Sequence, residues 1–239
     1  MKITVLFNSR AVSSSLQVGW GFSALIGDNI IFDTGEKGEF LFHNINALEI
    51  DLNIITTAVI SHEHWDHTGG LWQLLDYRKD IDVYACPGFS DEFKNNVRLH
   101  GGRLFEMESF YEITQDIWVT GEIPAVYKRE KTPEQALIID TERGLIVITG
   151  CAHPGIINML NIISEHFQGR PLYAVVGGFH LLNKPASVFN LIVETFKDMG
   201  IKKVGPTHCT GSEAENVFRQ VYREDFFNMS VGTVLNIGY

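Results

Sequence analysis

The sequence feature that most restricts the fold is an apolar segment that runs directly into a cluster of metal-binding residue types. Residues 54–61 are mainly β-branched and apolar, as in a buried strand, and His62-Glu63-His64-Trp65-Asp66-His67 follows at once. Loops at strand ends are where a rigid scaffold presents functional groups. Imidazole and carboxylate together suit zinc, iron or manganese. A lone histidine is more often a packing or surface residue, but this spacing matches a ligand pattern, so we predict a metal site here.

Apolar periodicity predicts alternating strands and helices in both halves of the chain. In the first half we expect a helix from about Gly70 and strands at residues 3–7, 22–26, 29–33, 54–61 and 82–85. In the second half we expect helices after Pro154, after Pro185 and through Tyr222, the last with Ser212 as its N-cap, and strands at 135–140, 144–149, 172–176, 203–206 and 231–237. Two groups of strands with intervening helices predict two sheets packed on each other with helices outside.

Composition and charge restrict the class of protein. The 239 residues are 45% hydrophobic, enough for one large core, so we expect a single domain over residues 1–239. The net charge is −10 and no stretch concentrates Lys or Arg, which argues against nucleic acid as a partner. No apolar stretch reaches the length of a membrane span, and Cys86, Cys151 and Cys209 do not suggest a disulfide framework. We therefore expect a cytoplasmic protein with no membrane partner, whose oligomeric state the sequence does not give.

The cluster His62-x-His64-x-Asp66-His67, placed between a buried strand and Thr-Gly-Gly at 68–70, resembles the signature of the metallo-β-lactamase superfamily. Residues 30–35, Ile-Ile-Phe-Asp-Thr-Gly, are similar to the Asp-bearing turn that supports the ligand loop there. The resemblance implies an α/β fold, the αββα four-layer sandwich, with its site at one edge of the two sheets. It also implies one or two divalent transition-metal ions, zinc foremost, with manganese or iron as alternatives. His62 and His64 would then bind the first metal, and Asp66 and His67 the second.

The remaining ligands depart from the family's pattern. The strand at 144–149 resembles the one that leads to a bridging Asp, but Cys151 and His153 follow it. No histidine lies between His100 and His153, so His153 is the expected third ligand of the first metal. Cys151 either binds or bridges the metals as a thiolate or is an inert buried thiol. His208 follows a short strand, as the family's last His does, and is expected to bind the second metal.

Other residues have less motif support. His180 ends the segment Val-Val-Gly-Gly-Phe-His and is expected in the active site as a ligand or proton donor; the alternative is an ordinary loop histidine. We expect Cys209 to be structural, with its side chain pointing away from the metal. Trp20, Trp65 and the stretch Gly121–Glu134 are expected to line or cover the pocket. The residues with no motif around them, expected at the surface or in packing, are His43, His100 and His166, and Cys86 is expected to be structural.

Three segments, 149–155, 177–181 and 206–211, resemble an archaeal and bacterial subgroup of that superfamily. The subgroup is often named after a methanopterin-pathway enzyme, a dihydropterin-methyl-ribofuranosylaminobenzene phosphate synthase. The resemblance implies a metal-dependent hydrolase, or a related transferase, that acts on a small, anionic, phosphorylated or ester-like molecule through a metal-activated water. Asp66 would bind metal and orient the nucleophile. The synthase reaction is the first alternative, and a non-catalytic metal-binding protein is the second.

Three expected helix starts lie beside these histidines, after residues 68–70, at Pro154 and after residues 210–212. Helix N-termini offer free N–H groups and partial positive charge, which suit phosphate or carboxylate. The alternative interpretation is ordinary strand-to-helix turn chemistry.

Overall fold

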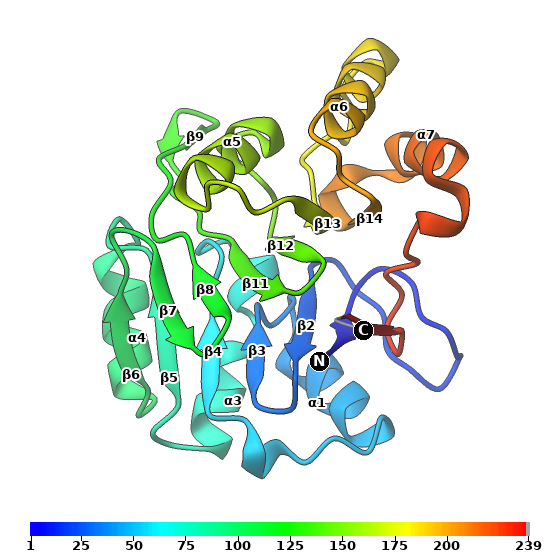
Figure 1. Ribbon diagram of the computed structural model, residues 1–239. Coiled ribbons are helices and arrows are strands. Elements are labelled where there is room, and N and C mark those ends of the chain that lie inside the picture. Colours follow the sequence, from blue (N-terminus) through cyan, green and yellow to red (C-terminus); the bar gives the residue numbers. More distant parts are fainter. Residues whose placement is uncertain (238–239) are drawn as a thin grey trace.

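The computed structural model describes residues 1–237 and shows two mixed β-sheets packed face to face (Figure 1). The first sheet has the order β15-β1-β2-β3-β4-β5-β6, and the second has the order β14-β13-β12-β11-β8-β7. The first sheet consists of β1 (Lys2–Phe7), β2 (Ser23–Ile26), β3 (Ile30–Phe32), β4 (Thr57–Val59), β5 (Asp82–Ala85), β6 (Arg103–Glu106) and β15 (Val234–Asn236). The second consists of β7 (Tyr111–Thr114), β8 (Ile117–Val119), β11 (Leu137–Thr141), β12 (Gly144–Thr149), β13 (Leu172–Gly178) and β14 (Lys203–Thr207). A separate hairpin pairs β9 (Val126–Tyr127) with β10 (Glu130–Lys131).

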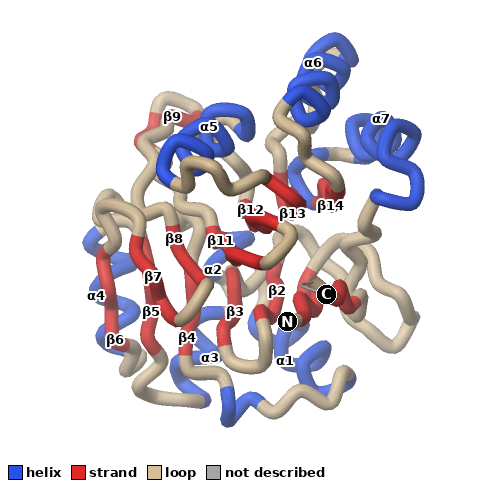
Figure 2. Tube along the Cα trace, viewed as in Figure 1, coloured by secondary structure: helices blue, strands red, loops and turns tan. Residues whose placement is uncertain are grey.

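Helices connect the parallel strands, because parallel neighbours need a crossover connection. Strands β3 to β6 pair in parallel, and so do β12 to β14. The helices are α1 (Gly38–Ala47), α2 (Trp65–Thr68), α3 (Leu71–Tyr77), α4 (Asp91–Leu99), α5 (Ile156–His166), α6 (Ala186–Asp198) and α7 (Ser212–Tyr222), with short 3-10 helices η1 (Leu52–Ile54), η2 (His208–Thr210) and η3 (Arg223–Asp225). Figure 2 shows α5, α6 and α7 on one side of the sheets and α1 and α3 on the other. No helix among residues 1–237 has the length and apolar character that crossing a bilayer requires.

Three apolar clusters hold the four layers together. Along β12, Ile146 and Ile148 join the cluster between the sheets, whereas Leu145 and Val147 join the cluster under α5, α6 and α7. This alternation follows from the two-residue period of a strand. A third cluster packs Leu41 of α1 and residues of α3 and α4 against the outer face of the first sheet. The expected αββα four-layer sandwich is confirmed.

The parallel arrangement brings the carboxyl ends of several strands to one edge of the molecule. Asp33 follows β3, residues 60–67 follow β4, and residues 150–153 follow β12. His180 and His208 follow β13 and β14. The segments that carry chemistry are therefore presented together, although they are far apart in the sequence.

Differences from the predicted elements have local causes. The strand expected at 54–61 is limited to β4, because residues 52–54 form η1, whose Asn53 N–H is bonded by the Asp51 side chain. The strand expected at 231–237 begins only at Val234, after Gly232 with a φ of +88°. The proposed capping role of Ser212 is wrong: Gly211 occupies the N-cap position of α7, with no side-chain cap. Helices α1 and α4 and strands β6 to β10 were not predicted.

Candidate active site

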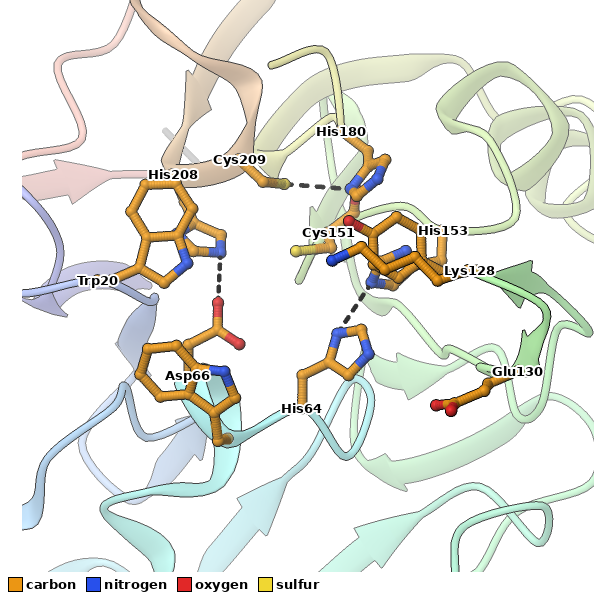
Figure 3. A pocket seen from close by; sticks show the side chains of 12 residues that line it. Trp20, His64, Asp66, Lys128, Glu130, Cys151, His153, His180, His208 and Cys209 are labelled. Carbon is orange, nitrogen blue, oxygen red and sulfur yellow. Dashed lines mark hydrogen bonds and ion pairs between the residues drawn. The ribbon is translucent and has the colours of Figure 1, made fainter. Parts of the chain in front are cut away.

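The predicted site residues surround one pocket at this edge, with a volume of about 280 Å³ (Figure 3). The predicted ligands and catalytic residues that line it are His64, Asp66, Cys151, His153, His180 and His208. The expected lining by Trp20 and Trp65 is confirmed, and Tyr127, Lys128 and Glu130 line the pocket from the stretch Gly121–Glu134. His62 and His67 lie beneath them with no exposed surface. The ligand loop differs from the expectation in one respect, because Asp66 and His67 belong to the short helix α2 and not to a loop. The structure therefore brings all the predicted ligands together.

His62, His64 and His153 form the first group of candidate ligands. One ligand atom of each lies within 4.8 Å of the others, and His64 Nδ1 is 3.3 Å from His153 Nε2. Burial lowers the pKa of all three, with the neighbouring histidines adding to the effect at His62 and His153, and brings His153 to about 3. The three imidazoles are therefore neutral at neutral pH, which is the state that binds a metal ion.

Hydrogen bonds determine which nitrogen His62 offers. The Ser61 hydroxyl donates to Asp33 Oδ2 at 2.7 Å, so the Nδ1–H of His62 donates to Ser61 Oγ at 2.9 Å. His62 Nε2 is then left with a lone pair, and within residues 1–237 this buried atom has no hydrogen-bond partner. A ligating histidine typically has this arrangement, in which the second nitrogen is held by a polar neighbour. The orphaned nitrogen fits a metal ion.

Asp66, His67 and His208 form the second group. His208 Nε2 lies 3.2 Å from His67 Nε2 and 3.1 Å from Asp66 Oδ2, while His67 Nδ1 donates to Asp33 Oδ2 at 2.6 Å. Burial lowers the pKa of His67, but Asp33 outweighs this effect and raises it to about 9. His67 therefore carries a proton on Nε2 as well, and a bound metal cation would compete with this proton for the nitrogen. Burial opposes ionisation of Asp66, yet the hydrogen bond from His208 and the charge of His67 hold its pKa below the usual range. This group therefore supplies an ionised carboxylate.

Cys151 lies between the two groups. Its Sγ is 3.4 Å from His67 Nε2, and it shares one candidate group with His62 and His67 and another with His153 and His180. This is a position from which a thiolate can reach either metal, and ligation by Cys151 stays a prediction. Burial raises the pKa of its thiol, so a bound cation is the factor that would favour the thiolate.

The expectation that Cys209 points away from the site is wrong. Cys209 lines the pocket, and its thiol donates to the Cys151 carbonyl at 3.6 Å. Strand β14 ends at Thr207, and His208 has a φ of +53° and opens η2, so the alternation of a strand does not apply to this pair. Burial opposes the thiolate of Cys209, but hydrogen bonds to Cys151 and His180 outweigh it and hold its pKa low.

His180 lies in the pocket beside the first group. Its ring centroid is 4.5 Å from that of His153, and Figure 3 shows it paired with Cys209. Its φ of +53° resembles those of Ala152 and His208. Left-handed backbone at non-glycine residues is uncommon and tends to cluster at functional sites. The histidines without a motif lie elsewhere: His43 bonds the Ser15 carbonyl, His100 pairs with Asp76, and His166 stacks on Phe110.

Glu134 has a role that the sequence analysis did not identify, because it was expected only as the end of a stretch that lines or covers the pocket, whereas its side chain is fully buried. Its buried Oε1 accepts hydrogen bonds from the N–H groups of Gly150, Cys151 and Ala152, and its Oε2 accepts one from His153. Burial, opposed by these hydrogen bonds, raises the pKa of Glu134 to about 7. One signal could have revealed it. The β11–β12 register pairs Leu137 with Ile148 and Ile138 with Val147. Continued beyond the strands, that register places Glu134 opposite Cys151.

Residues 21–160 match the model of the metallo-beta-lactamase superfamily, and the chain belongs to this superfamily. The fold of this superfamily binds divalent metal ions, in agreement with the two groups above. The chain is 30% identical to the 7,8-dihydropterin-6-methyl-4-(beta-D-ribofuranosyl)-aminobenzene-5'-phosphate synthase of Methanocaldococcus jannaschii, over 88% of this chain and 85% of that protein. It is 26% identical to a ribonuclease Z of Listeria monocytogenes, over 77% of this chain and 61% of that protein. The solved structure of Tm1679, described as a metal-dependent hydrolase of the beta-lactamase superfamily, matches 100% of both chains with a TM-score of 0.84 and 29% identity. These relatives include hydrolases and a synthase, so membership alone does not select one reaction.

Proposed function

We propose that this chain is a metal-dependent hydrolase, or a related transferase, that acts on a small phosphorylated or ester-like molecule. The observation that carries the proposal is the pair of ligand groups in the pocket. His62, His64 and His153 form one group and Asp66, His67 and His208 the other, each within 4.8 Å, with Cys151 between them.

The donor set supports one or two divalent ions, zinc foremost, with manganese or iron as alternatives. It combines imidazoles, one ionised carboxylate and one thiol. When bound, such ions lower the pKa of a water molecule and polarise the oxygen of a substrate. The expected arrangement places one ion among His62, His64 and His153 and a second beside Asp66, His67 and His208.

The chain's own residues would orient the metal ligands and the attacking group and would donate a proton to the leaving group. Asp33 fixes the direction of His62, through Ser61, and of His67 directly. Asp66 lines the pocket and can orient the attacking group by accepting a hydrogen bond from it. His180 lies beyond His153, where it can donate a proton to a leaving group. Trp20 packs against His208 with ring centroids 4.7 Å apart and lines the same pocket.

The second candidate is a dihydropterin pyrophosphate-dependent synthase, a transferase. The identity of 30% to the Methanocaldococcus jannaschii synthase, over most of both chains, favours it. The same pocket would serve both reactions. They differ in the acceptor, which is an arylamine in the synthase and water in the hydrolase.

The test is a substrate screen with zinc- or manganese-loaded protein. The panel contains phosphodiesters, lactones and a dihydropterin pyrophosphate, the last with and without an arylamine. Turnover by wild type and by His100→Ala, with loss in His64→Ala, supports the hydrolase. Pyrophosphate release that requires the arylamine supports the synthase instead. Bound metal without turnover of any substrate contradicts both and favours a non-catalytic protein.

A further inference from the structure

The hairpin β9–β10 covers one side of the pocket, and we propose that Lys128 at its turn binds the anionic group of the substrate. The ligand chemistry is a phosphate or carboxylate, whose oxygens accept hydrogen bonds from the ammonium group. This inference deepens the proposed function and rests on it for the nature of the pocket.

The two faces of the hairpin serve different surfaces. Tyr127 and Glu130 are paired across the strands, and both line the pocket that contains the histidines. Val126 and Lys131 form the next pair, and both line a second pocket of about 600 Å³ on the other face. Opposite faces are expected for successive residues of a strand. The hairpin is therefore a thin wall, and its turn projects at the edge of the metal-binding pocket.

The turn itself carries an unusual pair of residues. Lys128 has a φ of +50° and Arg129 a φ of +74°. A two-residue hairpin turn with both φ values positive strongly favours Asn-Gly, because left-handed backbone is unfavourable for long side chains. Two adjacent residues with long side chains at these positions therefore make the turn less stable than Asn-Gly would. Strain at such a position suggests a functional reason for the side chains.

The position of Lys128 supplies that reason. Its side chain lines the pocket and extends toward the middle of it in Figure 3. Its Nζ is 5.0 Å from the centroid of the Tyr127 ring. That ring lies 4.9 Å from His153 and 5.0 Å from His180. The Tyr127 ring is therefore a neighbour both of the Lys128 ammonium and of the imidazoles of His153 and His180.

The charges around Lys128 leave its ammonium free for a ligand. Lys128 is the single Lys or Arg among the described residues that line this pocket. Within residues 1–237 it forms no ion pair at 4.0 Å or less. Glu130 lines the same wall, but Figure 3 shows its carboxylate apart from the histidines. In a chain with a net charge of −10, this cation adds to the attraction that bound metal ions would exert on an anion.

Arg129 provides a matched control, because it adjoins Lys128 in the turn and carries the same charge. Both side chains are exposed, but Arg129 is not among the residues that line the pocket. The variants Lys128→Met and Arg129→Met each remove one positive charge from the same turn. A difference between them therefore reports direct contact and not the general field of the hairpin.

The experiment measures binding of inorganic pyrophosphate and of benzoate to zinc-loaded protein by calorimetry at low ionic strength. Lys128→Met is expected to weaken the affinity for at least one anion about tenfold, the size of one charge-assisted hydrogen bond. Arg129→Met should stay within about twofold and Lys128→Arg should retain most of the affinity. The anion whose affinity falls more in Lys128→Met shows whether phosphate or carboxylate is the preferred group.

Unchanged affinity for both anions in Lys128→Met, or equal losses in Lys128→Met and Arg129→Met, would overturn the inference. Circular dichroism and zinc content must match wild type in all variants, which separates a binding effect from a folding defect. Because the readout is binding, it does not depend on turnover. Lys128-dependent anion binding without turnover of any substrate would contradict the proposed function and leave this inference intact.

Discussion

Glu134 holds the loop that presents Cys151 and His153, with four backbone N–H groups bonded to one buried carboxylate. Glu134→Gln keeps the size and shape of the side chain but replaces one acceptor oxygen with an NH₂ group, which then faces a backbone N–H donor. A buried donor left without its acceptor costs about 1–3 kcal/mol. We expect the free energy of unfolding to fall by about 2 kcal/mol, and zinc affinity to fall because both candidate ligands shift. Urea denaturation and zinc titration measure the two effects, with the exposed Glu142→Gln as control. Wild-type values for both in Glu134→Gln would show that the carboxylate does not position the loop.

Cys151 can be tested through its reactivity. A thiolate bound to metal is poorly available to alkylating reagents. Labelling of Cys151 should therefore rise when a chelator removes the metal. Peptide mapping after labelling measures this, with Cys86 as the control because it lies in the apolar cluster under α3 and α4. Equal labelling of Cys151 in both states would favour the inert buried thiol.

Replacement of Cys151 tests its role as a ligand independently. Cys151→Asp should retain the metal content, because a carboxylate can bind or bridge divalent ions. Cys151→Ser should lose part of it, since a neutral alcohol is a weaker ligand. Elemental analysis of the purified variants decides the matter. If Ser and Asp both behave as wild type, Cys151 does not contact the metals, and His153 and His180 complete the site.

At the scale of elements, the close pairing of β12 with β13 depends on Gly177. Its φ is +116°, and a Cβ there would lie 2.0 Å from the Thr149 carbonyl oxygen. Gly177→Ala should therefore lower the free energy of unfolding by about 3 kcal/mol or more, from strain and overpacking together. Gly169→Ala is the control, because Gly169 also has a positive φ, +81°, but nothing within 4 Å of the added Cβ. It should lose about 1 kcal/mol. Similar losses in the two denaturation curves would contradict the packing argument.

The sequence predicts the elements whose pattern is local and strong. Strand β12 is found at the predicted residues 144–149, because its continuous apolar run and the turn before it give its bounds directly. Strand β6 is mostly exposed, and β9 and β10 have two residues each, so their pairing depends on contacts that a local pattern does not reveal. Helix α4 has few apolar residues, although Ser90 caps it.

The candidate site was predictable to the extent that its residues follow strands. His62, His153, His180 and His208 could be placed because each comes shortly after an apolar strand. The orientation of Cys209 could not, because it depends on the left-handed backbone of His208. Glu134 acts through backbone hydrogen bonds across a hairpin, which a search for ligand motifs does not detect. The roles assigned to the ligands stay predictions.

At the scale of the whole molecule, three apolar clusters hold the fold without the help of the metal-binding residues. His64→Ala and Asp66→Ala should therefore lose turnover and metal yet remain folded, unlike a zinc finger, which unfolds without its metal. Chelation of the wild type should lower its melting temperature, because a ligand that binds only the folded state stabilises it. Thermal denaturation followed by circular dichroism measures both. Unfolding of either variant, or of the chelated protein, at 25 °C would show that the site is structural.

The two sheets bring the ends of several strands to one edge of the molecule, and we place the metal chemistry at that edge. The expectations of a single domain over residues 1–239 and of a cytoplasmic protein stay predictions. The hairpin β9–β10 adds a cation to a pocket otherwise rich in histidine, which agrees with an anionic substrate.

The proposed function requires that the pocket histidines and Asp66 hold metal. The most direct measurement is anomalous X-ray diffraction from a crystal of the zinc-loaded protein, recorded above and below the zinc absorption edge. We expect one or two anomalous peaks, each about 2.0–2.3 Å from the ligand atoms of its group. One peak would lie among His62, His64 and His153, and a second beside Asp66, His67 and His208. Absence of any peak at these residues, in protein given zinc after chelation, would contradict the account.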